Sequence, residues 1–129
     1  VQLEASPTPL YKNEKTFAYT ILQLEKLGFT LHMFNNVNTR SFKPTVISKN
    51  QFIGLHHLFQ LDCVLIQNLE TINLYEIEKL KKLILIMFHS FKSVDLVDYL
   101  INLLDKKTNK NDIDKYRKIL PEVKFKKIY

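Results

Sequence analysis

Hydrophobic and polar positions at the start of the chain predict a strand, a helix and a second strand. Residues 1–4 alternate between apolar and polar side chains, and Pro7 ends that pattern. Asn13 is expected to cap a helix, with Gly28 at its C-terminal end. Residues 29–33 alternate again, as a second strand does. The helix is predicted by apolar residues at steps of three and four, namely Phe17, Ile21, Leu24 and Leu27.

The middle of the chain predicts a long connection followed by one more strand. Residues 35–54 are polar, contain Pro44 and show no helical face, so we expect a loop with a short strand at 45–48. Connections of this length inside a compact domain often carry function. Residues 61–67 form an apolar run of the kind found in a sheet that is covered on both faces.

The last part of the chain is predicted to be helical. An apolar stripe with helical spacing spans residues 74–91, Ser93 is expected to cap the following helix, and Pro121 ends a short helix over 113–120. The sequence therefore predicts an α/β part over residues 1–70, a helical extension over 71–120 and a basic tail over 121–129.

Composition limits the protein class. A chain of 129 residues that is 46% hydrophobic can bury one modest core. The longest apolar run, residues 83–88, is too short to span a bilayer. Cys63 is the single cysteine, so an internal disulfide is excluded and a reducing, cytoplasmic location is expected. Because Cys63 lies in an apolar run, we expect a buried thiol.

Charge is concentrated near the C-terminus. Lys and Arg balance Asp and Glu over residues 1–105, so residues 106–129 carry the whole formal charge of +6. Such a segment can bind nucleic acid or anionic lipid. The lysines are spread out, however, and we interpret the segment as a solvated surface, with nucleic acid not expected as a partner.

Several kinds of site are not predicted. The chain has two glycines, Gly28 and Gly54, which are too far apart to form a phosphate-binding loop. No metal site is expected, because His56 and His57 are adjacent and would point in different directions. Nothing in the spacing favours a Ser/His/Asp or Cys/His nucleophile.

Polar residues do occur where α/β domains bind ligands, outside the carboxyl ends of parallel strands. Glu4 lies near the end of the first strand and Tyr11 in the loop after it, although a sheet-edge carboxylate and a tyrosine packed on the loop are alternatives. Asp62 begins an apolar strand and needs a partner, which can be Arg40, a backbone amide or a substrate hydroxyl. Arg40 and Lys43 can hold an anionic or sugar ligand, or can simply be solvated.

Three stretches, residues 9–34, 40–44 and 54–69, resemble the C-terminal portion of FkbM-type methyltransferases. That family runs from a strand with an internal glutamate into a PLY-like turn, a helix and a GF-led strand, and later shows a motif like QLLWADAVFV. Glu4 and Tyr11 match the glutamate and the turn, and residues 57–64 (HLFQLDCV) match the later motif. Gln60 replaces a frequent Trp, and His57 replaces a frequent Gln. The resemblance covers roughly residues 1–105.

The resemblance implies the C-terminal part of a Rossmann-like class I methyltransferase sheet, with strand five, a helix, strand six, a long insert and an antiparallel strand seven. It implies O-methylation of a hydroxyl on a sugar or small metabolite, with S-adenosylmethionine as cofactor. The cofactor site would be built by earlier strands, so no cofactor-binding residue is expected in this chain. By the same resemblance Glu4 and Tyr11 would be catalytic, and the acceptor would be bound by Arg40, Lys43, His57 and Asp62.

Two hypotheses follow. Because residue 1 is Val and a strand is already under way there, the first is a truncated methyltransferase, inactive alone, whose partner is the missing N-terminal half of the same domain. It predicts an open sheet edge at residues 1–6 and no cofactor binding by this chain. The alternative is a stand-alone module that binds a protein or a nucleic acid through the basic tail.

Overall fold

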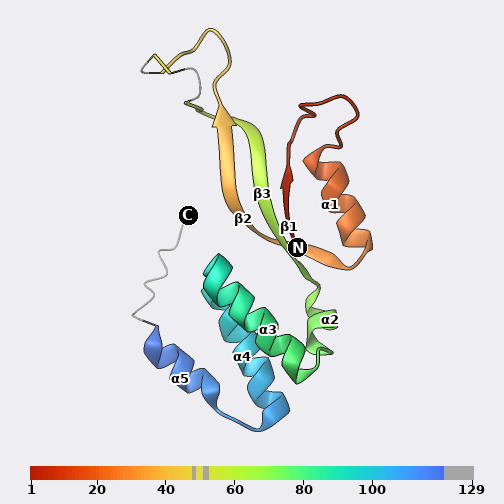
Figure 1. Ribbon diagram of the computed structural model, residues 1–129, viewed down its shortest axis with the longest axis vertical. Coiled ribbons are helices and arrows are strands. Elements are labelled where there is room, and N and C mark those ends of the chain that lie inside the picture. The colour runs from red at the N-terminus through yellow and green to blue at the C-terminus, as the bar shows by residue number, and fades with distance from the viewer. Residues whose placement is uncertain (48, 51–52, 121–129) are drawn as a thin grey trace. The chain divides into compact units, whose positions relative to one another are not determined.

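The computed structural model describes residues 1–47, 49–50 and 53–120 (Figure 1). Internal contacts divide the chain into two compact units, Val1–Thr71 and Ile72–Tyr129. The first unit holds the sheet and one long helix, and the second is helical. Within the described residues the protein is a mixed α/β chain with a three-stranded antiparallel sheet and five α-helices.

The sheet contains β1 (Gln2–Ala5), β2 (Phe29–Arg40) and β3 (His57–Gln67), in the order β1-β3-β2. The central strand, β3, is antiparallel to both of its neighbours, so β1 and β2 run in the same direction. Helix α1 (Phe17–Lys26) connects these two outer strands (Figure 1). The predicted strand, helix and strand at the start of the chain are therefore present.

Helix α1 covers one face of this sheet. The core of the unit consists of Leu61, Cys63 and Leu65 on β3, against which the apolar stripe of α1 packs. Phe17 on α1 also contacts Phe34 on β2, with ring centroids 5.9 Å apart. The core side chains alternate along β3 because successive residues of a strand point to opposite faces. Phe17, Ile21 and Leu24 of the predicted stripe pack here, whereas Leu27 is the C-cap residue and is 70% exposed, so its place in the stripe is wrong.

The start of α1 differs from the prediction. Thr16, not Asn13, is the N-cap, and its hydroxyl accepts a hydrogen bond from the backbone N–H of Tyr19 at 3.2 Å. Asn13 instead has a left-handed backbone with φ 70°, which a short polar side chain tolerates. At the other end, Gly28 has φ 81°, as expected for a glycine after the last helical turn.

The predicted loop over residues 35–54 is wrong for its first part, because β2 continues to Arg40. Pairing with β3 shifts register beside His32 and Asn35, so β-bulges break the alternation of apolar and polar positions there. In the predicted strand over 45–48, Ile47 forms an isolated bridge with Asn50, and Ser48 lies outside the described residues.

The second unit is built from short helices that bury a common core. They are α2 (Leu69–Asn73, which begins in the first unit), α3 (Ile77–Ile86), a π-helical turn (Met87–Phe91), α4 (Val94–Thr108) and α5 (Asp112–Ile119). Ile72, Leu80 and Leu100 are fully buried in it. None of the helices in the described part of the chain is both long and apolar enough to cross a membrane.

Candidate functional site

Glu4 and Asp62, two of the residues singled out in the sequence, lie directly opposite each other on the sheet. Glu4 on β1 pairs with Asp62 on β3, and Asn36 on β2 pairs with Asp62 from the other side. All three lie on the face opposite α1, because their neighbours Leu3 and Cys63 pack towards that helix. The bulge at Asn35 is what brings Asn36 onto this face.

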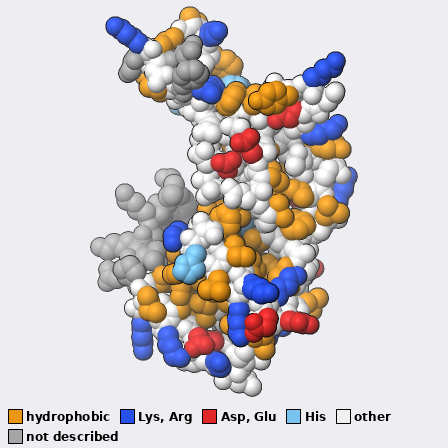
Figure 2. Space-filling model, viewed as in Figure 1, with side chains coloured by type: hydrophobic (Ala, Val, Ile, Leu, Met, Phe, Trp, Pro, Cys, Tyr) orange, Lys and Arg blue, Asp and Glu red, His pale blue; other side chains and the backbone are white. Residues whose placement is uncertain are grey.

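Two further amide side chains continue this row. The Nδ2 of Asn36 donates to Oδ1 of Asn38, and the Nδ2 of Asn38 donates to Oε1 of Gln60, each at 3.4 Å. Asp62 and Gln60 are half-buried, whereas the other members are exposed. Figure 2 shows acidic side chains gathered over the strands. We call this set the polar sheet face; it consists of Glu4, Asn36, Asn38, Gln60 and Asp62.

The polar sheet face combines hydrogen-bond acceptors and donors on a rigid support. Carboxylate oxygens of Glu4 and Asp62 can only accept, while amides both donate and accept. Like charges that face each other across two strands repel, so we expect this pair to lower stability. A residue pair that costs stability on an exposed surface is more readily understood as a ligand site than as a structural contact.

Arg40 does not lie opposite Asp62, where the sequence analysis offered it as one possible partner. It pairs with His57, the first residue of β3, which is about 16 Å along that strand from Asp62. The Arg40 guanidinium lies 4.5 Å from the centroid of the Phe59 ring. The Phe42 and His57 rings are also 4.5 Å apart. The predicted substrate-binding residues therefore fall into two groups.

Tyr11 lies in the turn after β1 and is 76% exposed, so it is not packed on the loop. A carboxylate that the sequence analysis did not single out shapes this turn. Oε2 of Glu14 accepts hydrogen bonds from the backbone N–H groups of Leu10 at 2.5 Å and Tyr11 at 3.0 Å. Its position three residues after Tyr11 is the local signal that could have identified it.

Four of the predicted site residues, Tyr11, Arg40, Lys43 and His57, lie at or after the strand ends near one edge of the sheet, whereas Glu4 and Asp62 pair farther along the strands. Because β1 and β2 run in the same direction, both point towards the edge where β3 begins, but β1 ends opposite Leu61 and β2 ends opposite His57. The connections that carry Tyr11 and Lys43 both leave from this edge, and Arg40 and His57 form its last pair. Ligands of open α/β sheets bind at such an edge.

Both glycines of the chain have structural places in the fold. Gly28 ends α1, and Gly54 packs so closely on the Thr39 carbonyl that a Cβ there would overlap it. Neither glycine therefore forms a loop whose backbone amides could bind a phosphate group. In the parts of the chain that the structure describes, no group of three or more His, Cys, Asp or Glu residues could hold a metal ion.

Cys63 is fully buried, as the apolar run predicted. Burial raises the pKa of its thiol, and the negative charge of the adjacent Asp62 adds to that effect. The thiolate is thus disfavoured, and Cys63 acts as a core residue.

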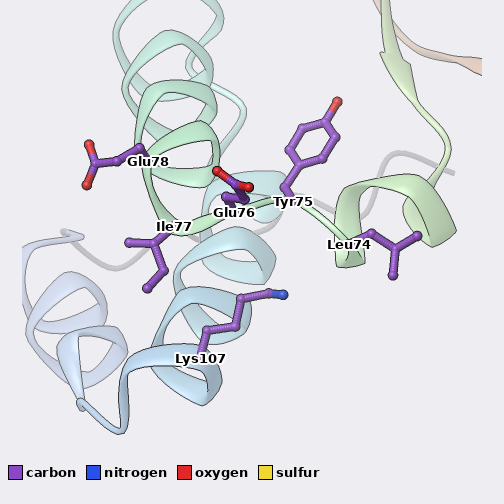
Figure 3. A pocket seen from close by; sticks show the side chains of 6 residues that line it. All are labelled: Leu74, Tyr75, Glu76, Ile77, Glu78 and Lys107. Carbon is purple, nitrogen blue, oxygen red and sulfur yellow. The ribbon is translucent and has the colours of Figure 1, made fainter.

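The helical unit contains a hollow that the sequence analysis did not find. It has a volume of about 470 Å³ and is bordered by residues 74–78, which join α2 to the first turn of α3, and by Lys107 near the end of α4 (Figure 3). The ammonium of Lys79 lies 3.7 Å from the centroid of the Tyr75 ring beside it. Leu74 is 83% exposed, so the hollow is a shallow surface feature. No local sequence pattern predicts this hollow, because it forms between two segments that are far apart in the sequence.

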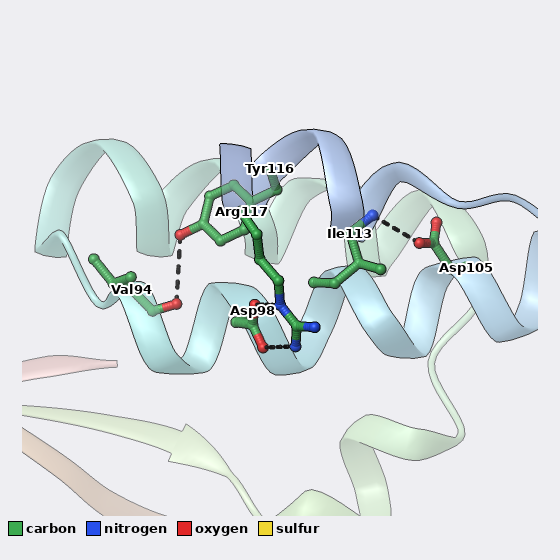
Figure 4. Close-up of polar contacts among 6 residues, drawn as sticks. All are labelled: Val94, Asp98, Asp105, Ile113, Tyr116 and Arg117. Atoms are coloured by element: carbon green, nitrogen blue, oxygen red, sulfur yellow. Dashed lines mark hydrogen bonds and ion pairs between the residues drawn. The ribbon is translucent and has the colours of Figure 1, made fainter. Parts of the chain in front are cut away.

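The described part of the basic segment is engaged in contacts within its own unit (Figure 4). Arg117 on α5 donates two hydrogen bonds of 2.7 Å to the carboxylate of Asp98 on α4. These bonds lower the pKa of Asp98. Asp105 accepts a hydrogen bond from the backbone N–H of Ile113 at 2.8 Å and so caps α5. The predicted basic tail, residues 121–129, lies outside the described residues.

Comparisons of this chain with protein-family models, with curated proteins and with solved structures found no match.

Proposed function

We propose that this chain supplies the acceptor-binding edge of an S-adenosylmethionine-dependent O-methyltransferase that acts on a hydroxyl of a sugar or small metabolite. The observation that carries the proposal is the opposed pair of Glu4 and Asp62 on the sheet face away from α1, near the carboxyl end of β1. The FkbM-type resemblance of the sequence supplies the reaction class.

The direction of the strands supports this proposal. The resemblance implies a strand, a helix and a strand, followed by a long insert and an antiparallel last strand. In the chain, β1 and β2 are joined through α1, and β3 returns antiparallel to both. A fold-level likeness of this kind is limited support by itself, so the site residues have to carry the argument.

The outer edge of β1 is where the proposal places the cofactor-binding half of the domain. β1 pairs with β3 along one edge, and its other edge has no strand partner among the described residues. Unpaired N–H and C=O groups of an edge strand are a template for a further strand. The proposed partner is therefore the N-terminal half of the same domain.

The polar sheet face would bind and orient the acceptor. Carboxylates of Glu4 and Asp62 can accept hydrogen bonds from a hydroxyl, and a carboxylate in this place can take the proton that the hydroxyl loses. Asn36, Asn38 and Gln60 can hold neighbouring hydroxyls, since each amide offers both a donor and an acceptor. Methyl transfer itself would need groups supplied by the partner half.

Saturation-transfer NMR of this chain with a panel of methyl glycosides and small polyols tests the proposal. We expect at least one polyol to contact the polar sheet face, and the Asp62→Asn variant to weaken its binding. Glu25→Gln, which removes a charge from the exposed surface of α1, is the matched control and should bind like wild type. Equal binding by wild type and Asp62→Asn would contradict the proposal.

A further inference from the structure

The connection between β2 and β3 exposes apolar side chains from both of its arms. Phe42 is 70% exposed and Val46 is 54% exposed on the arm that leaves β2. Ile53 and Leu55 are exposed on the arm that returns to β3. We call these residues, together with the exposed Lys43 and Lys49 between them, the hairpin tip.

The two arms of the connection contact each other directly, without burying the apolar side chains of the hairpin tip between them. The hydroxyl of Ser41 donates to the carbonyl of Ile53 at 3.0 Å. Gly54 lies against the backbone of Thr39 without room for a Cβ. The Phe42 ring contacts His57 but remains 70% exposed. The arms are thus tied together while the apolar groups stay at the surface.

The charge around the hairpin tip has one sign. Residues 26–61 contain no Asp or Glu, whereas Lys43 and Lys49 lie among the exposed apolar residues. Figure 2 shows Lys and Arg together with hydrophobic side chains around this end of the sheet unit. A surface that is both apolar and free of negative charge complements a partner that is itself anionic and apolar.

We propose that the hairpin tip docks on the surface of an anionic phospholipid bilayer. Phe42, Val46 and Ile53 would enter the boundary between headgroups and acyl chains, and the two lysines would pair with lipid phosphates. The exposed apolar residues are mostly aliphatic, which favours lipid over single-stranded nucleic acid, because bases stack on aromatic rings. This inference does not depend on the methyl-transfer proposal.

Co-sedimentation of the full chain with vesicles tests this inference. We expect binding to phosphatidylcholine vesicles that contain phosphatidylserine, and much weaker binding to phosphatidylcholine alone. Each lysine near an anionic surface strengthens binding about fivefold, so Lys43→Gln with Lys49→Gln should weaken it about 25-fold. Phe42→Ser with Val46→Ser should also weaken it, and that loss should persist at high salt.

A charge-matched variant separates docking from general attraction. Lys106→Gln with Lys110→Gln removes the same charge from exposed positions in the helical unit and should change the affinity by no more than about twofold. Circular dichroism establishes that each variant folds. Equal loss in this control, unchanged binding by either hairpin variant, or binding of single-stranded RNA without vesicle binding would each overturn the proposal.

Discussion

The opposed carboxylates of Glu4 and Asp62 make a prediction about stability. They occupy directly paired positions on β1 and β3, so their Cβ atoms are about 5 Å apart. Two unit charges at that distance repel by about 0.8 kcal/mol in bulk water, and salt lowers this value. Glu4→Gln and Asp62→Asn should therefore each raise the free energy of unfolding of the sheet unit by a few tenths of a kcal/mol, up to about 0.8 kcal/mol.

A double-mutant cycle isolates this repulsion. The double variant should gain about as much stability as either single variant, since removing one charge already relieves the pair. Native-state hydrogen exchange at the amides of Cys63 and Leu65 reports on the sheet unit without interference from the helices. Glu25→Gln serves as the control for lost charge and should gain nothing.

The double-mutant cycle can also refute this prediction. If both single variants are as stable as wild type or less stable, or if their effects add in the double variant, the two carboxylates do not interact. The polar sheet face would then lose the feature that distinguishes it from an ordinary solvated sheet surface. Added salt provides a second check, because it should stabilise wild type but leave Glu4→Gln unchanged.

Three further predictions concern local structure. Asp105→Ala should destabilise the helical unit by about 1–2 kcal/mol, because the N–H of Ile113 loses its cap, and Asp105→Asn should cost less; chemical denaturation compares them. The Arg117 hydrogen bonds lower the pKa of Asp98 in the folded state, so their stabilising effect is present above the unfolded pKa of about 3.9 and is lost as pH falls. The stability difference between wild type and Asp98→Asn should thus shrink in acid, and a pH-independent difference would contradict this. Gly54→Ala should distort the hairpin, because its Cβ meets a backbone carbonyl, and should cost about 1–3 kcal/mol by hydrogen exchange.

Elements with a local signal could be predicted from the sequence. The stripe of α1 and Gly28 define a helix and its end, because packing on one face needs a period of 3.6 and a left-handed residue favours glycine. The start of α1 was misplaced by three residues. Asn13 and Thr16 are both good caps, and the choice between them depends on where the turn after β1 ends.

Features that depend on strand register could not be predicted. The polar pattern of residues 35–40 predicts a loop, yet these residues form the last part of β2, with bulges that disturb the alternation. The pairing of Asp62 with Glu4, and of Arg40 with His57, follows from a register that joins distant segments. The sequence pattern places Glu4 and Asp62 on strands but puts Arg40 in a loop and His57 before a strand, and it does not indicate which of them face one another.

The coding DNA upstream of the Val1 codon gives the most direct test of the central claim, that β1 is an inner strand of a larger methyltransferase sheet. The account predicts an open reading frame that continues there and encodes a strand followed by a glycine-bearing loop. An in-frame stop codon directly upstream, or a continuing frame without such a strand and loop, would contradict it.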